Sequence, residues 1–110
     1  MSDTDSLYWG RLMEVDFADD DLDRLEVDAR ASAQHGQNVD RAFRKVMQAV
    51  RAASDVRDLQ AARGLRFERL QGKRAHQCSL RLNKQWRLIV ELVGAGTSAR
   101  MLIVEIADYH

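Results

Sequence analysis

The sequence contains no proline and a single cysteine, Cys78, among its 110 residues. One cysteine cannot close an internal disulfide bond, and such sparse use is typical of proteins in the reducing cytosol. No apolar run approaches the roughly 20 residues that span a bilayer. The first ten residues, MSDTDSLYWG, are polar and acidic, which is the opposite of a secretory signal peptide. We therefore expect a cytoplasmic protein that contacts no membrane.

The sequence also lacks low-complexity tracts and internal repeats, so nothing marks a linker between domains. Apolar residues make up 45% and charged residues 31% of the chain, as in an ordinary globular protein. A chain of 110 residues is long enough for one domain with a modest core. We predict a single domain over residues 1–110, with a short acidic extension over about residues 1–11.

Motifs for metals and nucleotides are absent as well. Three scattered histidines and one cysteine show no metal-ligand spacing, and there is no glycine-rich phosphate loop. We therefore predict no metal ion and no cofactor. His35, beside Gly36, is expected to be exposed to solvent, and His76 to have no special role. Cys78 is expected to be an inert, buried thiol.

The formal net charge of zero conceals two regions of opposite charge. Residues 1–30 carry ten acidic and three basic side chains, whereas residues 61–90 carry eight basic side chains and one acidic, Glu68. A strongly basic region on a neutral chain is the electrostatic signature of a surface that binds polyanions. Solvated arginines and lysines on an open sheet face account for the charge equally well.

Apolar periodicity predicts a strand and two helices in the first half of the chain. Residues 12–17 alternate between apolar and polar, which is typical of a half-buried strand. Asp19, Asp20 and Asp21 are candidates to begin a helix that Gly36 ends. Asn38 is a candidate cap for a second helix, and a connection of only a few residues predicts an antiparallel helix hairpin. The apolar stripes are Leu22, Leu25, Ala29 and Ala33 in the first helix, and Val39, Phe43, Val46, Val50 and Ala53 in the second.

Three strands are predicted after a turn or short helical piece over residues 55–64. Residues 77–82 and 86–92 alternate and are joined by a tight loop at residues 83–85. A turn around Gly94 and Gly96 follows, and residues 101–107 are almost continuously apolar, as in a strand buried on both faces. We therefore predict an α+β fold in which the first strand and the helix hairpin pack on an antiparallel sheet of three to four strands.

The alternation places Arg81 and Arg87 on the sheet face opposite the helices. Lys73, Arg74 and Lys84 from the flanking loops are expected to add to this basic face. Converging arginines can hold consecutive phosphates and stabilise charge that develops on one of them. The alternative is that both arginines are only paired with carboxylates of the same face, Glu91 and Glu105.

The sequence ends in Asp108, Tyr109 and His110, directly after the apolar strand. Polar residues at the open end of a buried strand are typical of a catalytic group, and histidine titrates near neutral pH. The alternative is that these residues are solvated and frayed, as terminal polar residues usually are.

Three motifs together resemble the HigB-type toxins of the RelE/ParE toxin–antitoxin superfamily. They are a Leu-Gln-Gly loop at residues 70–72, an Asn-Lys-Gln-Trp-Arg hairpin at residues 83–87 and the terminal Asp-Tyr-His. The order of the predicted elements also agrees, so the resemblance covers about residues 12–110. The sequence departs from the family pattern at Gln71, Lys73 and Cys78. Glu68 stands where a related toxin has a histidine implicated in cleavage, which leaves open whether it completes the acid–base set.

The resemblance implies a RelE-like fold and a toxin that cleaves messenger RNA in the ribosomal A site. It implies a helix-turn-helix antitoxin of the HigA type as partner, with operator DNA contacted only through that antitoxin. Carried over by position, Arg87 would contact the scissile phosphate and Lys73 and Arg74 would hold the RNA backbone. Asp108, Tyr109 and His110 would form the catalytic group.

Metal-free cleavage of RNA needs a base for the 2′-hydroxyl, an acid for the departing oxygen and cations for the charge on phosphorus. We hypothesise that His110, oriented by Asp108, is the acid or the base, and that Arg87 and Arg81 stabilise the transition state. Tyr109 would stack on a base or position the phosphate. Two other functions stay open: a ParE-like toxin directed at DNA gyrase, and a non-catalytic relative that only binds a partner.

Overall fold

The computed structural model describes residues 13–32, 34–94 and 100–108. Their strands are β1 (Glu14–Phe17), β2 (Glu68–Arg69), β3 (Gln77–Arg81), β4 (Trp86–Val93) and β5 (Arg100–Asp108). Their helices are α2 (Asp20–Val27), α3 (Gln37–Ala52) and α4 (Val56–Ala61), with short 3-10 turns η1 (Arg63–Leu65) and η2 (Gly72–Arg74). Within these ranges no helix is both long and apolar enough to cross a membrane.

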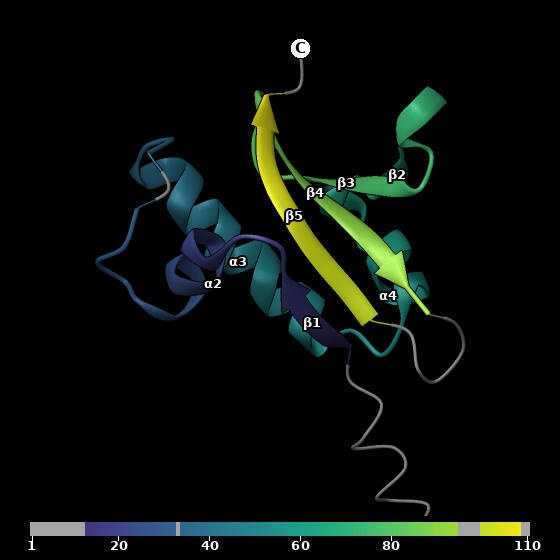
Figure 1. The fold of residues 1–110 in the computed structure, drawn as a ribbon, viewed down its shortest axis with the longest axis horizontal. Coiled ribbons are helices and arrows are strands. Elements are labelled where there is room, and N and C mark those ends of the chain that lie inside the picture. The colour runs from purple at the N-terminus through teal and green to yellow at the C-terminus, as the bar shows by residue number, and fades with distance from the viewer. Residues whose placement is uncertain (1–12, 33, 95–99, 109–110) are drawn as a thin grey trace, which may run out of the picture.

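The strands form one mixed sheet in the order β1-β5-β4-β3-β2. Strands β2 to β5 pair antiparallel with their neighbours, whereas β1 pairs parallel with β5, Phe17 lying opposite Ile103. Figure 1 shows β5 between β1 and β4, with β1 beside its first half. The α+β class is therefore confirmed. The expectation of an antiparallel sheet of three to four strands is wrong in the number of strands and in the direction of β1.

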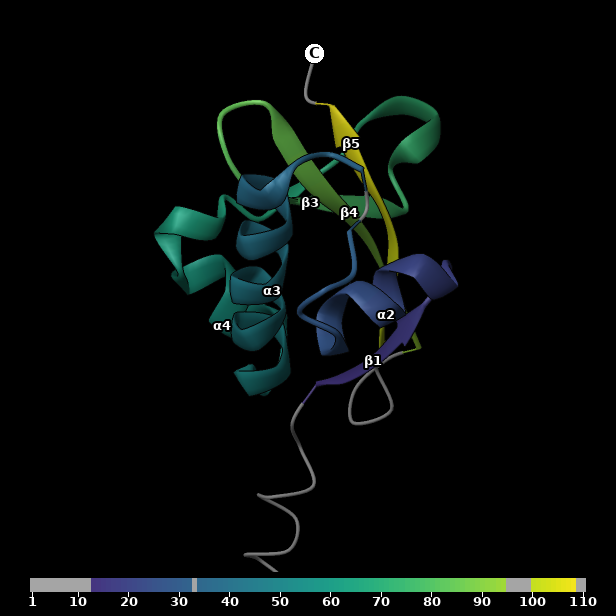
Figure 2. The same ribbon diagram turned by 90° about the vertical axis from the view of Figure 1, so that its left-hand side faces the viewer.

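The apolar side of α3 forms the centre of the core. Phe43, Met47 and Val50 are fully buried, as are the facing side chains of β3, β4 and β5: Leu80, Leu88, Val90, Met101 and Ile103. Figure 2 shows α3 and α4 on one side of the strands, with the η2 segment on the other side. The opposite sheet face carries Arg81, Arg87 and Glu91, which alternate with the core residues, and also the buried residues Gln77, Ser79 and Ile89.

A bulge in β5 keeps its core side chains in phase. Ile103 lies opposite Val90 and Glu105 opposite Ile89, so Val104 is an extra residue between them. Met101 and Ile103 before the bulge and Ile106 after it are all buried. The bulge therefore lets one strand bury its apolar residues and still carry Glu105 on the opposite face.

The first predicted helix is shorter than the sequence pattern suggested. The carboxylate of Asp19 accepts a hydrogen bond from the Asp21 amide at 2.8 Å, which confirms an aspartate cap at its start. The helix ends at Val27 rather than at Gly36, because Asp28 is already extended. The second helix begins at Gln37 after Gly36, which has a φ of 101° and provides no side-chain cap, so Asn38 is not its cap. The connection between the two helices therefore spans residues 28–36.

Arg44 of α3 holds this long connection in place. Its guanidinium donates hydrogen bonds to the carbonyl oxygens of Leu25 at 2.9 Å and of Asp28 and Ala31 at 3.1 Å each. Carbonyls at the end of a helix have no partner within the helix, so a cation that satisfies them stabilises the helix end. One side chain thus ends α2 and fixes the path of the chain toward α3.

We expect Arg44→Met to lower the free energy of unfolding by about 2 kcal/mol, because it removes three charge-assisted hydrogen bonds from a partly buried site. Urea denaturation followed by circular dichroism measures this. Arg41→Met, an exposed position on the same helix, is the matched control and should change stability by less than about 0.5 kcal/mol. Equal effects of the two substitutions would contradict the role of Arg44.

Candidate functional site

The hairpin between β3 and β4 is built around Asn83. Its side-chain oxygen accepts hydrogen bonds from the backbone amides of Gln85 at 2.9 Å and Trp86 at 2.8 Å. The amides of Leu82 and Asn83 in turn donate to the carbonyl of Trp86. An asparagine side chain that bonds to the backbone two residues ahead is the usual way to fix such a turn. The hairpin is therefore held by four hydrogen bonds over five residues.

Arg81 and Arg87 lie directly opposite each other across β3 and β4. The Arg87 guanidinium donates to the carbonyl oxygen of Asn83 at 2.8 Å, and the Arg81 Nε donates to the same oxygen at 3.4 Å. Both side chains are half-buried. The two arginines alternate with the core residues Leu80 and Leu88, as the sequence predicts. The hairpin thus brings two guanidinium groups together at one point.

A second basic group reaches the same face from η2. The Arg74 guanidinium bonds to Glu105 of β5 at 2.9 Å and to the side-chain oxygen of Gln77 at 2.7 Å, and Gln77 donates to Glu91 at 3.0 Å. Glu105 lies opposite Ile89, and Ile89 is two residues along β4 from Arg87. The Arg74 guanidinium, which contacts Glu105, therefore lies beside the arginine pair on the same sheet face. Two residues of strand separate adjacent rows by about 7 Å.

The two carboxylates of this face, Glu91 and Glu105, have other partners than Arg81 and Arg87, with which the alternative interpretation of the sequence paired them. Among the hydrogen bonds of the described residues, Glu105 accepts from Arg74 and Glu91 from Gln77. Arg81 and Arg87 donate to the hairpin carbonyl instead. These hydrogen bonds of Arg81 and Arg87 are therefore not to Glu91 or Glu105.

The predicted lysines lie at its margins. Lys73 in η2 and Lys84 in the hairpin are both exposed, as is His76 in the turn before β3. Glu68 is exposed in β2 and lies opposite Ser79. Lys84 directly follows Asn83, so its ammonium group adds positive charge near the arginine pair.

Asp108 ends β5 beside the hairpin. Its carboxylate accepts a hydrogen bond from the Gln85 side chain at 3.0 Å, and its register partner is Trp86. Ala107 lies opposite Arg87, so the side chains of these two residues share one face of the sheet. The next residue of β5, Asp108, therefore points to the other face. Asp108 and Arg87 thus contact the hairpin from opposite faces of the sheet. Tyr109 and His110 lie outside the described residues. Of the predicted terminal group, only Asp108 is therefore placed.

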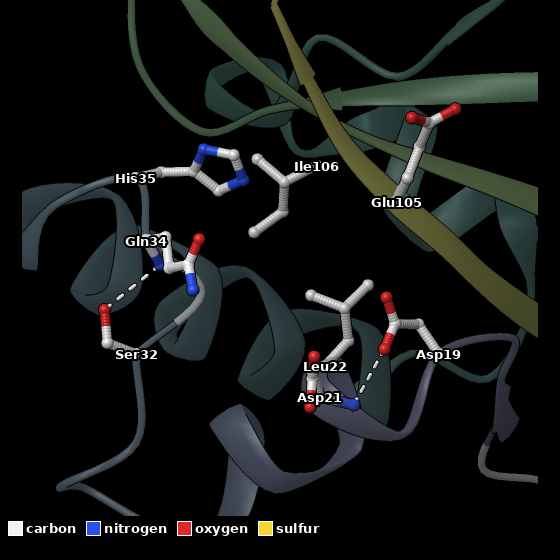
Figure 3. A pocket seen from close by; sticks show the side chains of 8 residues that line it. All are labelled: Asp19, Asp21, Leu22, Ser32, Gln34, His35, Glu105 and Ile106. Carbon is white, nitrogen blue, oxygen red and sulfur yellow. Dashed lines mark hydrogen bonds between the residues drawn. The ribbon is translucent and has the colours of Figure 1, made fainter.

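His35 was expected to be exposed but is half-buried. Its ring lies 4.5 Å from the ring of Trp86, at an interplanar angle of 43°. Gln34 and Gly36 have positive φ angles of 70° and 101°, and these two bends turn His35 toward the sheet. Figure 3 shows the His35 ring pointing toward Ile106 of β5. Gly36 was read as the end of a helix, so the sequence interpretation missed that it belongs to a bent connection.

A small hollow beside His35 has a different character from the basic face. Its acidic lining residues are Asp19, Asp21 and Glu105, and Leu22 and Ile106 contribute apolar surface (Figure 3). Three carboxylates make a poor environment for a phosphate group. Within residues 13–32, 34–94 and 100–108, no group of three or more histidine, cysteine and acidic side chains could hold a metal ion.

Comparison with known protein families matches residues 15–110 to a family described as the RelE-like toxin of the type II toxin–antitoxin system HigB. The chain belongs to this family of HigB-like toxins. Toxin HigB-1 of Vibrio cholerae serotype O1 is 32% identical over 81 residues, which cover 74% of this chain and 85% of that protein. A toxin of a type II system has a cognate antitoxin, so this HigB-like chain has such a partner.

A solved structure agrees with the fold of this HigB-like toxin. The YoeB/ParE toxin from Agrobacterium tumefaciens superposes with a TM-score of 0.51, covering 89% of this chain and 100% of that one. The two sequences are 16% identical, so the similarity extends to the fold alone.

Cys78 is buried in this HigB-like toxin, as expected, with 7% of its surface exposed. Burial raises the pKa of its thiol, and this effect is larger than the opposing attraction of Arg69. Because only the thiolate is nucleophilic, a raised pKa and burial both slow its reaction.

We expect a disulfide reagent at pH 8 to label Cys78 much more slowly in the folded protein than in urea. Equal rates in the two states would contradict this account.

Proposed function

We propose that this HigB-like toxin is a ribosome-dependent endoribonuclease that cleaves messenger RNA in the ribosomal A site without a metal ion or cofactor. The observation that carries the proposal is the convergence of Arg81 and Arg87 on the Asn83 carbonyl. It lies within residues 61–90, which have a net charge of +7, and next to the end of β5. Family membership supports the same activity through the resemblance to HigB-type toxins.

The arginine pair would bind the scissile phosphate. A guanidinium offers a planar fork of donors that fits two phosphate oxygens, and two such groups can contact one phosphate from adjacent strands. Attack by the 2′-hydroxyl places additional negative charge on the phosphate oxygens. Donors that are already oriented toward that charge stabilise the transition state without reorganisation. Asn83 would therefore act as the positioning residue for both arginines.

Proton transfer is assigned to the C-terminal residues. His110 would act as the acid or the base, because imidazole titrates close to neutral pH. Asp108, held by Gln85, would orient His110, and Tyr109 would stack on a base or position the phosphate. Glu68 is exposed on β2, which two strands, β3 and β4, separate from β5, so it would not complete the same group.

The remaining basic side chains would hold the RNA backbone. Arg74 lies on the face of the arginine pair, and Lys73 and Lys84 are exposed at its margins. The ribosome would supply the in-line geometry of the RNA, so little cleavage of free RNA is expected. We further propose that the chain is a single domain that acts in the cytoplasm. Its partner would be a HigA-like helix-turn-helix antitoxin, and operator DNA would be contacted only through that antitoxin.

The test is translation of a defined message by purified ribosomes with the toxin added, and cleavage mapped by primer extension. We expect cuts at the A-site codon, and Arg87→Ala should slow them by about 100-fold, as loss of one transition-state donor does. His110→Ala should do the same. Arg30→Ala, a side chain that is 94% exposed and distant in sequence from the hairpin, is the control and should cut at the wild-type rate.

The alternatives give different results in this assay. A ParE-like toxin directed at gyrase would leave the message intact and would block supercoiling of DNA instead. A non-catalytic relative would leave both processes unaffected. Wild-type cleavage by both Arg87→Ala and His110→Ala would overturn the assignment of the catalytic residues and leave the activity itself standing.

A further inference from the structure

A groove runs between α3 and η1 and ends at the last residues of β3. Its apolar surface comes from Ala42, Val46 and Ala49 of α3 and from Leu65 and Leu82 on the other side. The small alanine side chains leave room for another segment to approach the helix backbone. Such a depression resembles the grooves that accept the apolar side of a peptide segment.

The charges around this groove are all of one sign. Lys45, Arg63 and Arg81 line it, and among its described lining residues none is acidic. Lys45 and Arg63 are exposed. An apolar groove between cations is complementary to a segment that has apolar side chains along one side and carboxylates at its flanks.

We propose that this groove binds an amphipathic, acidic segment of the cognate antitoxin, with carboxylates that pair with Lys45 and Arg63. Membership in the type II toxin family establishes that an antitoxin exists. The position of its contact is inferred from the apolar surface and the charges of the groove alone.

RNA fits this groove less well than a protein segment does. Nucleic acids are held by phosphate contacts and by bases that stack on aromatic rings. No aromatic side chain is among the described residues that line the groove, and its floor is formed by alanine, valine and leucine. An apolar floor stabilises a ligand that buries apolar side chains, and a phosphate backbone has none to bury.

Arg81 connects the groove to the arginine pair. It lines the end of the groove and also donates to the carbonyl that Arg87 contacts. A carboxylate that pairs with Arg81 would compete for the group that, under the proposed function, holds phosphate. Binding at the groove would therefore weaken RNA binding at the adjacent face, and this second part of the inference rests on the proposed function.

The test measures the affinity of the purified toxin for its cognate antitoxin by isothermal titration calorimetry. We expect the double substitution Lys45→Glu and Arg63→Glu to raise Kd by about 100-fold, because two attractive charge pairs become repulsive. Arg30→Glu reverses an exposed charge outside the groove and should leave Kd within about threefold. Hydrogen exchange on the wild-type pair, which needs no variant, should show that the antitoxin protects residues 42–49 and 62–65.

Each combination of results decides the proposal. Unchanged affinity in the double variant together with no protection of the groove would overturn it. So would unchanged affinity with slowed cleavage on the ribosome, because the groove would then bind RNA. Concentration-dependent self-association of the free toxin that the double variant abolishes would assign the groove to a second copy instead. If the antitoxin binds as expected and no message is cleaved, the proposed function fails and the docking site stands.

Discussion

Two like charges face each other across β3 and β4, and the candidate site depends on how the hairpin compensates them. Arginines directly opposite each other in an antiparallel pair repel and destabilise the sheet. The Asn83 carbonyl accepts from both guanidinium groups, and the Asn83 side chain fixes the turn that presents this carbonyl. This carbonyl therefore holds the two guanidinium groups close to one another. Under the proposed function, two guanidinium groups held this close would contact one phosphate together.

The rest of the fold keeps this face available. Because α3 fills the core from the other side, the polar side chains that alternate along β3, β4 and β5 lie on the face away from it. The bulge at Val104 keeps β5 apolar toward the core and still places Glu105 on the basic face, where it fixes Arg74. Arg81 then joins this face to the groove beside α3. Under the two proposals, catalysis and binding of the antitoxin would share this one residue at the end of β3.

The sequence was sufficient to predict the features that depend on local alternation and caps. The α+β class and the placement of Arg81 and Arg87 on the sheet face away from the helices follow from periods of two and of about four residues. The cap at Asp19 follows from the run of aspartates before the helix. Alternation does not report the direction of pairing, so the parallel placement of β1 was missed. The end of α2 depends on Arg44, which lies 19 residues from Leu25 in the chain, and no local pattern signals it. The contact of His35 with Trp86 is likewise a long-range one that only the folded chain reveals.

The central claim is that Arg81 and Arg87 act together on one phosphate, and a double-mutant cycle tests it most directly. Single-turnover cleavage on programmed ribosomes would be measured for Arg81→Met, Arg87→Met and the double variant. Residues that act as a unit give strongly non-additive losses. We predict that the double variant is slower than wild type by much less than the product of the two single effects. A loss equal to that product would show that the arginines act independently and would contradict the account.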